Sequence, residues 1–561
     1  MLVRDQLGAW LAGEQFAGSY GTRGKPGWPP SRLALVTIFQ RAEDLTGRQA
    51  AEAARARVGW KYALGLDLAD PGFGHSILSE FRARVAAGGL EQVVLDALLA
   101  RLAGDGLIKA GGKQRTDSAR VVAAVAALSR LELAGESARA ALEALAAAHP
   151  AWLEQRICVA GFTRRYGTPV TSWRPPASRA RRDELAIAFA RDGYALLEAV
   201  HGSSAPGWLR ELPAVDVLRR VLLQNCTRTI TADGREVIRR REKEPGGDGL
   251  PPGQARIASP YDTDARRGVK REEFWLGCKL HITETCDGAP PCTCPRAGAP
   301  QAAGARAGGN AREHDKGCAH LVFPNLITHS AATDATVTDN QMTGAIHDDL
   351  TAKNLAPGRH YADSGYLSAT LVVSELARHG IALIGPLLAG TSAQARAGNG
   401  YARADFTIGY DTQTVTCPQG STSASRTPCT QHGKNAIVAT FSASDCGPCP
   451  ARGLRTTGRR RQLSLLPRDL AQAQAAARAA ETTISFQAGY ARRAGVEGTM
   501  HQAAGHGARR ARYRGLPKTR LDHVYMACAL NLLRLEAYWT GTPLDRRRTS
   551  HLARLELGLA A

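Results

Sequence analysis

Apolar residues recur at helical spacing over the first hundred residues of the chain. The stretch PPSRLALVTIFQRAEDLTGRQAAEAARARV, residues 29–58, places Pro and Ser ahead of its periodic run, as the start of a helix often does. SILSEFRARVAAGGLEQVVLDALLARLA, residues 76–103, continues with the same spacing. We therefore predict a separate helical domain over residues 1–110.

The pattern then switches to a short strand and back to helices. A strand is expected within residues 111–127, ending at Asp117 in KQRTDSARV. LELAGESARAALEALAAA, RDELAIAFARDGYALLEAV and PAVDVLRRVLLQN restore the helical spacing over residues 128–255. These runs predict an all-helical insertion, which the polar turn EKEPGGDGLPPGQ closes.

Alternation typical of strands returns in FWLGCKLHITETC, residues 274–286, and HLVFPNLITHSAAT after it can pair as the next strand. The segment between them is rich in Gly, Ala, Pro and Arg and cannot bury enough apolar surface to order itself. We expect a flexible hairpin extension there. Its cysteines, Cys292, Cys294 and Cys318, are too irregularly spaced to predict a metal site.

A helix over residues 339–352, the strand RHYAD, the helix SATLVVSELARHG and the strand IALIGPLL alternate as in a βαβ unit with parallel strands. Asp363 ends the first of these strands, and the carboxyl ends of strands are where ligands bind in open α/β sheets. We predict an α/β core, a mixed sheet flanked by helices, over residues 256–388. Helices over residues 486–545 complete it, and residues 546–561 form a tail.

Residues 389–485 interrupt this core with a second insertion that contains cysteines. Cys446 and Cys449 form a C-x2-C pair, whose tight turn lets two thiolates reach one tetrahedral Zn²⁺. A complete zinc site would also need Cys417 together with Cys429 or His432. A zinc ribbon and a purely structural loop both fit this pattern.

The charge of the chain favours a polyanionic partner. Its 561 residues carry 72 Lys and Arg against 51 Asp and Glu, a net charge of +21. Nucleic acid fits best, although ribosomal or membrane-surface binding would suit the same charge. No run reaches the roughly 18 apolar residues of a membrane-spanning helix, and the N-terminus lacks a secretory apolar region. We expect a cytoplasmic protein whose 12 cysteines are reduced.

Candidate chemistry centres on FQAGYARRAGVEGTMHQ, residues 486–502. On one helix, Tyr490, Arg493 and Glu497 would fall within an arc of roughly 60°. Arg can fork onto phosphate oxygens, and Glu supplies a hard oxygen ligand for a metal ion. The stripe suits a phosphate and a metal, but a solvated helix face would have the same spacing.

The pattern Y-(2)-R-(3)-E formed by these residues resembles the signature around the third acidic residue of DDE transposases of bacterial insertion sequences. The resemblance implies an RNase H-like catalytic core with two further Asp on strands, for which Asp117 and Asp363 are the candidates. It implies that Asp117, Asp363 and Glu497 hold two Mg²⁺ or Mn²⁺ ions. Tyr490 and Arg493 would position the scissile phosphate.

The same resemblance implies the reaction and the partners. A transposase of this kind cleaves double-stranded DNA at terminal inverted repeats and joins it to target DNA, as a homodimer in the DNA complex, on the bacterial nucleoid. Its N-terminal helices bind DNA, so the arginines of residues 1–110 are expected to contact the DNA backbone: Arg41, Arg48, Arg55, Arg57, Arg82 and Arg84. A basic segment should add phosphate contacts: Arg509, Arg510, Arg512, Arg514 and Lys518.

The sequence departs from the family pattern at two positions. Ala504 stands where the signature has Lys, and Arg455 stands where related chains often carry a further Cys. These departures make an inactive DNA-binding remnant one alternative. A metal-dependent nuclease without strand transfer is another, because it would share the same acids. Asp262 and Asp264 compete with Asp117 as the first acid, but they precede a strand and suit a polar turn, and Asp334 suits a turn as well.

Overall fold

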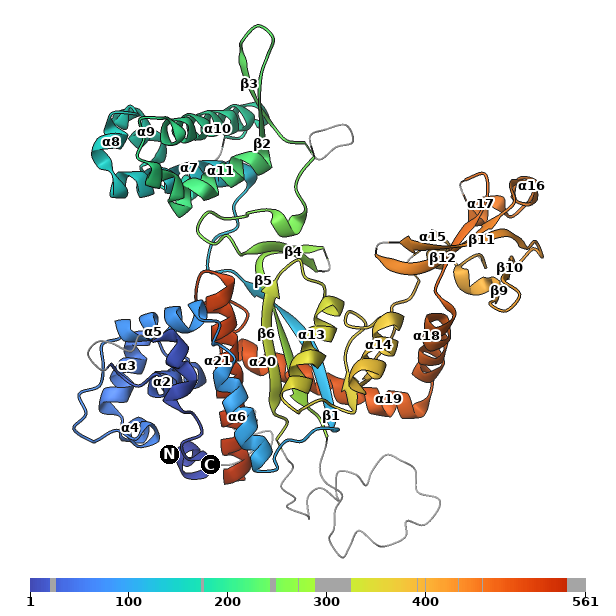
Figure 1. Cartoon of the computed structure of the whole chain (residues 1–561), viewed down its shortest axis with the longest axis horizontal. Helices are drawn as coiled ribbons and strands as arrows, with labels where there is room; N and C mark the ends of the chain where they lie inside the picture. The colour runs from blue at the N-terminus through green and yellow to red at the C-terminus, as the bar shows by residue number, and fades with distance from the viewer. Residues whose placement is uncertain are drawn as a thin grey trace, which may run out of the picture.

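The computed structural model has a central sheet with helical and mixed bodies around it (Figure 1). The structure describes residues 1–20, 27–172, 176–242, 249–270, 272–287, 324–390, 392–398, 400–431, 433–456 and 458–541. The expected hairpin extension with Cys292, Cys294 and Cys318, His432 and the tail over residues 546–561 lie outside the described residues.

Six strands form the central mixed sheet. Strand β1 (Lys113–Val122) pairs antiparallel with β5 (Glu273–Thr285) on one side and parallel with β7 (Arg359–Tyr361) on the other. Strand β8 (Ala382–Ile384) continues the parallel part beside β7. The far edge of β5 pairs antiparallel with both β4 (Arg266–Lys270) and β6 (Ile327–Asp334).

Helices cover both faces of this sheet, which is why β5 is buried over most of its length. Helices α13 (Asp339–Ala352) and α14 (Ala369–His379) cover one face. Helices α20 (Gly495–Gly505) and α21 (Leu516–Thr540) cover the other, where Met500 and Met526 pack on Leu280 and Ile282 of β5. The strands and helices predicted for residues 274–286, 339–352 and 359–388 are confirmed.

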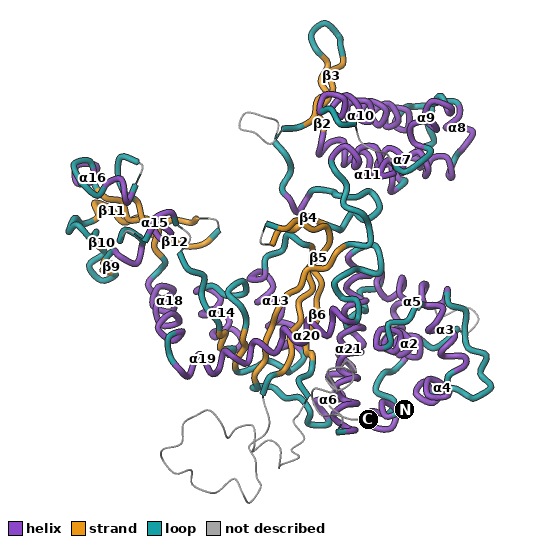
Figure 2. Tube along the Cα trace, turned by 180° about the vertical axis from the view of Figure 1, so that it is seen from behind, coloured by secondary structure: helices purple, strands orange, loops and turns teal. Residues whose placement is uncertain are grey.

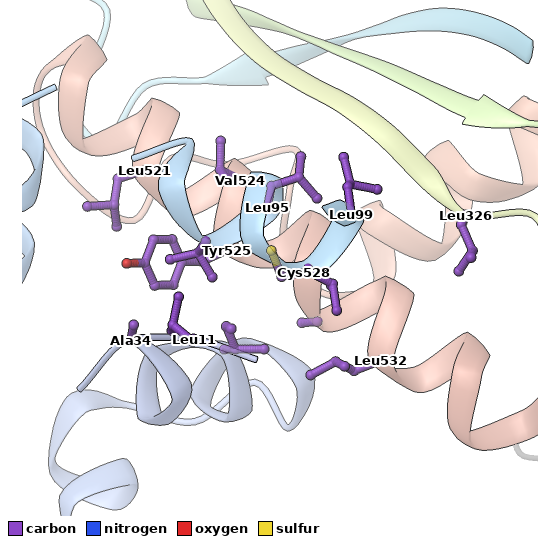
Figure 3. Packing of buried hydrophobic residues seen from close by; sticks show 14 of the residues in the cluster. Leu11, Ala34, Leu95, Leu99, Leu326, Leu521, Val524, Tyr525, Cys528 and Leu532 are labelled. Carbon is purple, nitrogen blue, oxygen red and sulfur yellow. The ribbon is translucent and has the colours of Figure 1, made fainter. Parts of the chain in front are cut away.

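The N-terminal helices share their core with α21 and are not the separate module that the sequence predicts. Apolar side chains of α21 such as Tyr525 and Leu532 pack among N-terminal residues such as Ala34 and Leu95 (Figure 3). This helix is apolar on two faces, and the other face packs on β6. The N-terminal elements are α1 (Leu2–Leu7), η1 (Gly13–Ser19), α2 (Pro30–Ala42), α3 (Gly47–Ala56), α4 (Val58–Leu64), α5 (Ser76–Ala87) and α6 (Val93–Gly104).

The first insertion has its own hydrophobic core but is not all helical. Strands β2 (Cys226–Ile230) and β3 (Glu236–Arg240) form a hairpin after its last helix. The alternation of TRTI and EVI around Asp233 and Gly234, with Gly234 at φ +77°, favours this turn over a helix. The helices are α7 (Arg130–Ala148), α8 (Pro150–Glu154), α9 (Val159–Tyr166), η2 (Val170–Ser172), α10 (Arg179–His201), η3 (Gly207–Glu211) and α11 (Pro213–Asn225), and η4 (Gly253–Ala255) follows the hairpin.

The described residues of the second insertion contribute no strand to the central sheet, as the sequence predicts. It projects from the core beyond α18 (Arg468–Glu481), a helix that packs on α14 (Figure 2). Its elements are α15 (Ala393–Ala397), η6 (Arg403–Asp405), β9 (Thr407–Gly409), β10 (Thr414–Thr416), β11 (Ser423–Gln431), β12 (Lys434–Phe441), α16 (Ala443–Cys446), α17 (Arg452–Arg455) and β13 (Gln462–Leu465). No helix in the described ranges has the length and apolarity needed to span a bilayer.

Candidate active site

Asp117 lies inside β1, not at its end as the sequence analysis predicts. The strand continues to Val122 because Ala119 and Val121 alternate inward and pack against the α20 and α21 side. Its parallel neighbour is shorter, since β7 ends at Tyr361 opposite Arg115. Two residues further along β1, Asp117 therefore lies where the parallel pairing has stopped.

Asp363 reaches the same place from the neighbouring strand. It follows Tyr361 by two residues, just as Asp117 follows Arg115, and residues two apart on a strand face the same side. The chain turns directly after it, where the Asp363 Oδ1 accepts a hydrogen bond from the Gly365 N–H at 2.9 Å. The two carboxylates thus lie near each other just beyond the point where the parallel pairing of β1 and β7 ends.

The segment with Tyr490, Arg493 and Glu497 is three short helical pieces, not the single regular helix expected. Helix α19 (Ile484–Tyr490) leads into the 3-10 turn η7 (Ala491–Ala494) and then into α20. A 3-10 turn is wound more tightly than an α-helix, so the spacing of an ideal helix does not apply across it. Glu497 lies in the first turn of α20, where the positive end of the helix dipole favours a carboxylate.

Arg493 connects this segment to β1. Its Nη1 lies 2.7 Å from the Glu497 Oε1, and its Nη2 lies 3.1 Å from the Asp117 Oδ2. The Arg493 and Asp117 side chains are 15% and 14% exposed, whereas that of Glu497 is 62% exposed. One half-buried guanidinium therefore links the first and third acids, with Glu497 at the solvent edge.

Burial and charge perturb the groups around Arg493. Burial raises the pKa of the Asp117 carboxyl, and the negative charge of nearby Asp363 raises it further. The guanidinium of Arg493 has the opposite effect and lowers this pKa, but burial is the larger cause. Burial also raises the pKa of the Tyr490 phenol, which lies in the fields of Arg493 and the three acids. These five side chains form one electrostatic cluster.

A buried network of charges lies directly beneath the cluster. Glu284 of β5 is 0% exposed and pairs with Arg115 Nη2 at 2.6 Å and Arg534 Nη1 at 2.7 Å. Thr499 of α20 donates its hydroxyl to the Glu284 Oε2 at 2.6 Å and accepts from the Arg534 Nη2 at 2.6 Å. Strands β1 and β5 and helices α20 and α21 are therefore tied together at one carboxylate.

The same network holds the 3-10 turn. Arg115 donates from its Nη1 to the Arg492 carbonyl at 2.5 Å, and a Cβ on Gly495 would lie only 2.0 Å from that nitrogen. The sequence analysis missed these residues, although a signal exists. Glu284 is an acid within an otherwise buried strand, and such a charge needs a buried partner.

A fourth carboxylate, Asp339 at the start of α13, was also missed. The position that a Cβ on Gly365 would take lies 3.1 Å from the Asp339 Oδ2 and 3.0 Å from the Asp363 Oδ1, so these oxygens are no farther apart than the sum of those distances. The Lys279 Nζ lies 3.3 Å from the Asp339 Oδ1. Lys279 therefore compensates the charge of Asp339.

Asp117, Asp363 and Glu497 offer the hard oxygen donors that Mg²⁺ and Mn²⁺ prefer. The adjacency of Asp117 and Asp363 suits one ion shared between them. In the described ranges, however, no group of three or more His, Cys, Asp or Glu residues gathers as a metal site. The Arg493 guanidinium instead forms ion pairs with both Asp117 and Glu497.

The cysteines of the second insertion do not all converge. Cys417 and Cys446 are buried in one apolar cluster. Cys429 pairs with Ala436 at the turn end of the β11–β12 hairpin, whereas Cys446 follows Phe441 at the other end. Five strand residues span about 17 Å, too far for Cys429 to share an ion with Cys446. The described residues therefore do not support Cys429 as a ligand. They do not gather Cys417, Cys446 and Cys449 as a metal site either, so zinc binding by these three stays a prediction for metal analysis of the protein.

The basic segment after α20 is only partly available to a ligand. Arg509, Arg510, Arg514 and Lys518 are exposed. Arg512 instead forms an ion pair with Asp44 and donates to the Leu45 carbonyl at 3.0 Å, so it joins the segment to the N-terminal helices. The expected DNA contact of Arg512 is replaced by this structural role.

Two of the N-terminal arginines are likewise structural. Arg41 is 1% exposed and lies 3.4 Å from Asp522 of α21, and Arg82 is buried against the ring of Tyr513. Neither can reach DNA. Arg55, Arg57 and Arg84 are exposed but pair with glutamates of their own region.

The other acidic candidates, Asp262, Asp264 and Asp334, accept hydrogen bonds from backbone N–H groups. Asp262 accepts from the Gly515 N–H at 3.0 Å and Asp264 from the Leu516 N–H at 2.9 Å, at the start of α21. Asp334 accepts from the Thr336 N–H at 2.7 Å in the turn expected for it. Asp117 is therefore the acid of this group that lies beside Asp363.

Two family models match the chain. "Transposase DDE domain" matches residues 416–536, which include Tyr490, Arg493 and Glu497. "Transposase domain (DUF772)" matches residues 3–84 in the N-terminal helices. Searches of curated proteins and of solved structures find no match.

Proposed function

We propose that the chain is a DDE transposase of insertion-sequence type, which cleaves DNA at transposon ends and joins those ends to target DNA; the two family models matched over residues 3–84 and 416–536 support this. Asp117, Asp363 and Glu497 are the catalytic carboxylates in this proposal. One observation carries it: Arg493 contacts Asp117 and Glu497 beside Asp363, so that segments more than a hundred residues apart meet at one point.

An RNase H-like core is part of the proposal. It is supported by the strand order, in which antiparallel β6, β5 and β1 are followed by parallel β7 and β8. Asp117 lies in β1 and Asp363 directly follows the adjacent β7, at the centre of this order, and the Glu comes from a helix packed on the sheet. This is the arrangement that the family resemblance implies.

Each side chain has a separate task in the reaction. Two divalent ions, when bound, activate the attacking oxygen and stabilise the leaving oxygen of the phosphodiester. Asp117 and Asp363 would hold one ion between them, and Glu497 would hold the second. Arg493 can exchange its carboxylate contacts for the phosphate oxygens of the substrate, because a guanidinium forks equally well onto either group. Tyr490 orients the same phosphate.

Exposed basic residues would hold the DNA outside the site. The protein would act on nucleoid DNA in the cytoplasm, with two copies of the chain in the DNA complex. The sequence charge of +21 supports such contacts. The residues proposed for this task are Arg509, Arg510, Arg514 and Lys518.

The test replaces each carboxylate by its amide, in Asp117→Asn, Asp363→Asn and Glu497→Gln. Each should abolish both cleavage of a terminal-repeat duplex and strand transfer, while affinity for that duplex persists. Asp411→Asn, which alters an exposed acid of the second insertion, is the control and should remain active. Cleavage by Asp117→Asn or Asp363→Asn at the wild-type rate would refute the assignment. Cleavage without strand transfer by the wild type would instead favour a nuclease.

A further inference from the structure

A groove of about 780 Å³ lies within the second insertion. It lies outside the cluster around Arg493, and its walls come from η6, β9, β13 and α18. Three arginines line it, Arg403, Arg461 and Arg478, and no carboxylate does. The other lining residues are apolar or neutral.

The charges of Arg403 and Arg478 meet no carboxylate in the groove lining. Arg403 donates to the side-chain oxygen of Gln474 at 2.6 Å, and Arg478 donates to the Leu388 carbonyl at 3.3 Å, so both meet neutral acceptors. Burial lowers the pKa of Arg403, and the like charge of Arg478 lowers it further. The Arg461 guanidinium lies 6.0 Å from the Phe406 ring centroid.

Acids near the groove are engaged elsewhere. Asp411 pairs with Arg468 at 2.6 Å, and Glu481 accepts from the Leu387 N–H at 2.9 Å. Half-buried like charges repel one another, and a bound anion would relieve this repulsion. The groove therefore has the charge and the donors of an anion site.

We propose that this groove binds the phosphodiester backbone of DNA. Guanidinium groups fork onto phosphate oxygens, and three of them along an open groove suit successive phosphates. The volume far exceeds that of one phosphate ion. Its wall α18 continues through α19 to Tyr490 and Arg493, so DNA held at the candidate active site can extend toward it. Only the choice of DNA as the polyanion rests on the proposed function.

The test measures affinity for a terminal-repeat duplex against salt concentration by fluorescence anisotropy. Each phosphate contact contributes about 0.9 to the slope of log K against log salt. The double variant Arg403→Gln/Arg478→Gln should therefore lower the slope by about 2. The matched control is Arg468→Gln, which removes an exposed arginine of α18 that pairs with Asp411 outside the groove, and its slope should equal that of the wild type. An unchanged slope in the double variant would overturn the proposal.

A second pair of variants separates charge from misfolding. Ala475 lines the groove on an exposed turn of α18. Ala475→Lys should tighten DNA binding and Ala475→Glu should weaken it, whereas a folding defect would weaken both. One outcome is that inorganic phosphate alone raises the melting temperature of the wild type but not of the double variant, while both proteins have the same slope of log K against log salt for DNA. The groove would then bind free phosphate, and the DNA proposal would fail. Because binding is measured without cleavage, an inactive wild type with the expected slopes would refute the proposed function and leave the groove standing.

Discussion

The Thr499 hydroxyl offers a way to disturb the position of Glu497 without touching any proposed ligand. Thr499→Val keeps the branched shape but removes both 2.6 Å hydrogen bonds, to Glu284 and from Arg534. Hydrogen bonds to charged groups contribute about 1.5–3 kcal/mol each. Glu284 keeps its two arginines, so we expect the free energy of unfolding to fall by about 2–3 kcal/mol.

The larger consequence should be catalytic. Thr499 lies two residues after Glu497 on α20, and its bond to Glu284 fixes how far that helix stands from β5. A displacement of about 1 Å can cost roughly 100-fold in rate, so cleavage should slow by about 10- to 100-fold. The metal concentration for half-maximal cleavage should rise, while affinity for DNA should not change. Thr499→Ser restores the hydroxyl and should restore both quantities.

The assays are urea denaturation and cleavage of a terminal-repeat duplex over a range of Mg²⁺ concentrations. Thr37→Val is the matched control, because Thr37 is a buried helical threonine that donates to the Leu33 carbonyl at 2.8 Å, far from the site. If Thr499→Val loses stability yet cleaves with the rate and metal dependence of Thr37→Val, the network supports the fold alone. The reasoning about Glu497 would then be wrong.

Three further predictions concern single groups. Arg493→Lys keeps the charge but loses the fork between Asp117 and Glu497, so cleavage should fall by about tenfold, and cleavage as weak as in Glu497→Gln would contradict a positioning role. Burial lowers the pKa of His281 to about 4. As the pH falls from about 6.5 to about 4, the unfolded state therefore takes up this proton before the folded state does, and the free energy of unfolding falls by about 3 kcal/mol. This loss should be absent from the pH profile of unfolding of His281→Gln. Asp522→Asn leaves Arg41 buried without its counter-charge and should cost about 3–5 kcal/mol in urea denaturation, and a loss below about 1 kcal/mol would show that the pair is not buried in solution.

Local patterns predicted much of the core. The alternation of FWLGCKLHITETC and the helix–strand succession after residue 338 depend on near neighbours, and both elements form where expected. The end of β1 was misplaced because the strand continues to Val122 along β5, where Val122 pairs with Gly277, a distant neighbour that the local pattern does not contain. The hairpin after Asn225 was missed because helical runs before it dominated the interpretation.

The candidate site residues also divide into those with a local sequence pattern and those defined by contacts between distant segments. Tyr490, Arg493 and Glu497 were found from their spacing, even though a 3-10 turn replaces the regular helix there. Glu284 was missed although an acid within a buried strand signals a buried partner. Arg534 and Asp339 carry no such local signal, because their partners come from other segments. Likewise, Arg41 and Arg512 read as surface charges in the sequence, and only the packing of α21 against the N-terminal helices turns them inward.

That packing has a consequence for synthesis on the ribosome. Helices α2, α5 and α6 leave the ribosome long before α21, which lies roughly 400 residues later and takes about 20–80 s to follow at typical elongation rates. During that interval their apolar faces lack the helix that covers them. A chain that stops before α21 leaves these faces exposed for good, which favours its aggregation or its degradation by proteases. Only chains translated through residue 540 can close this core.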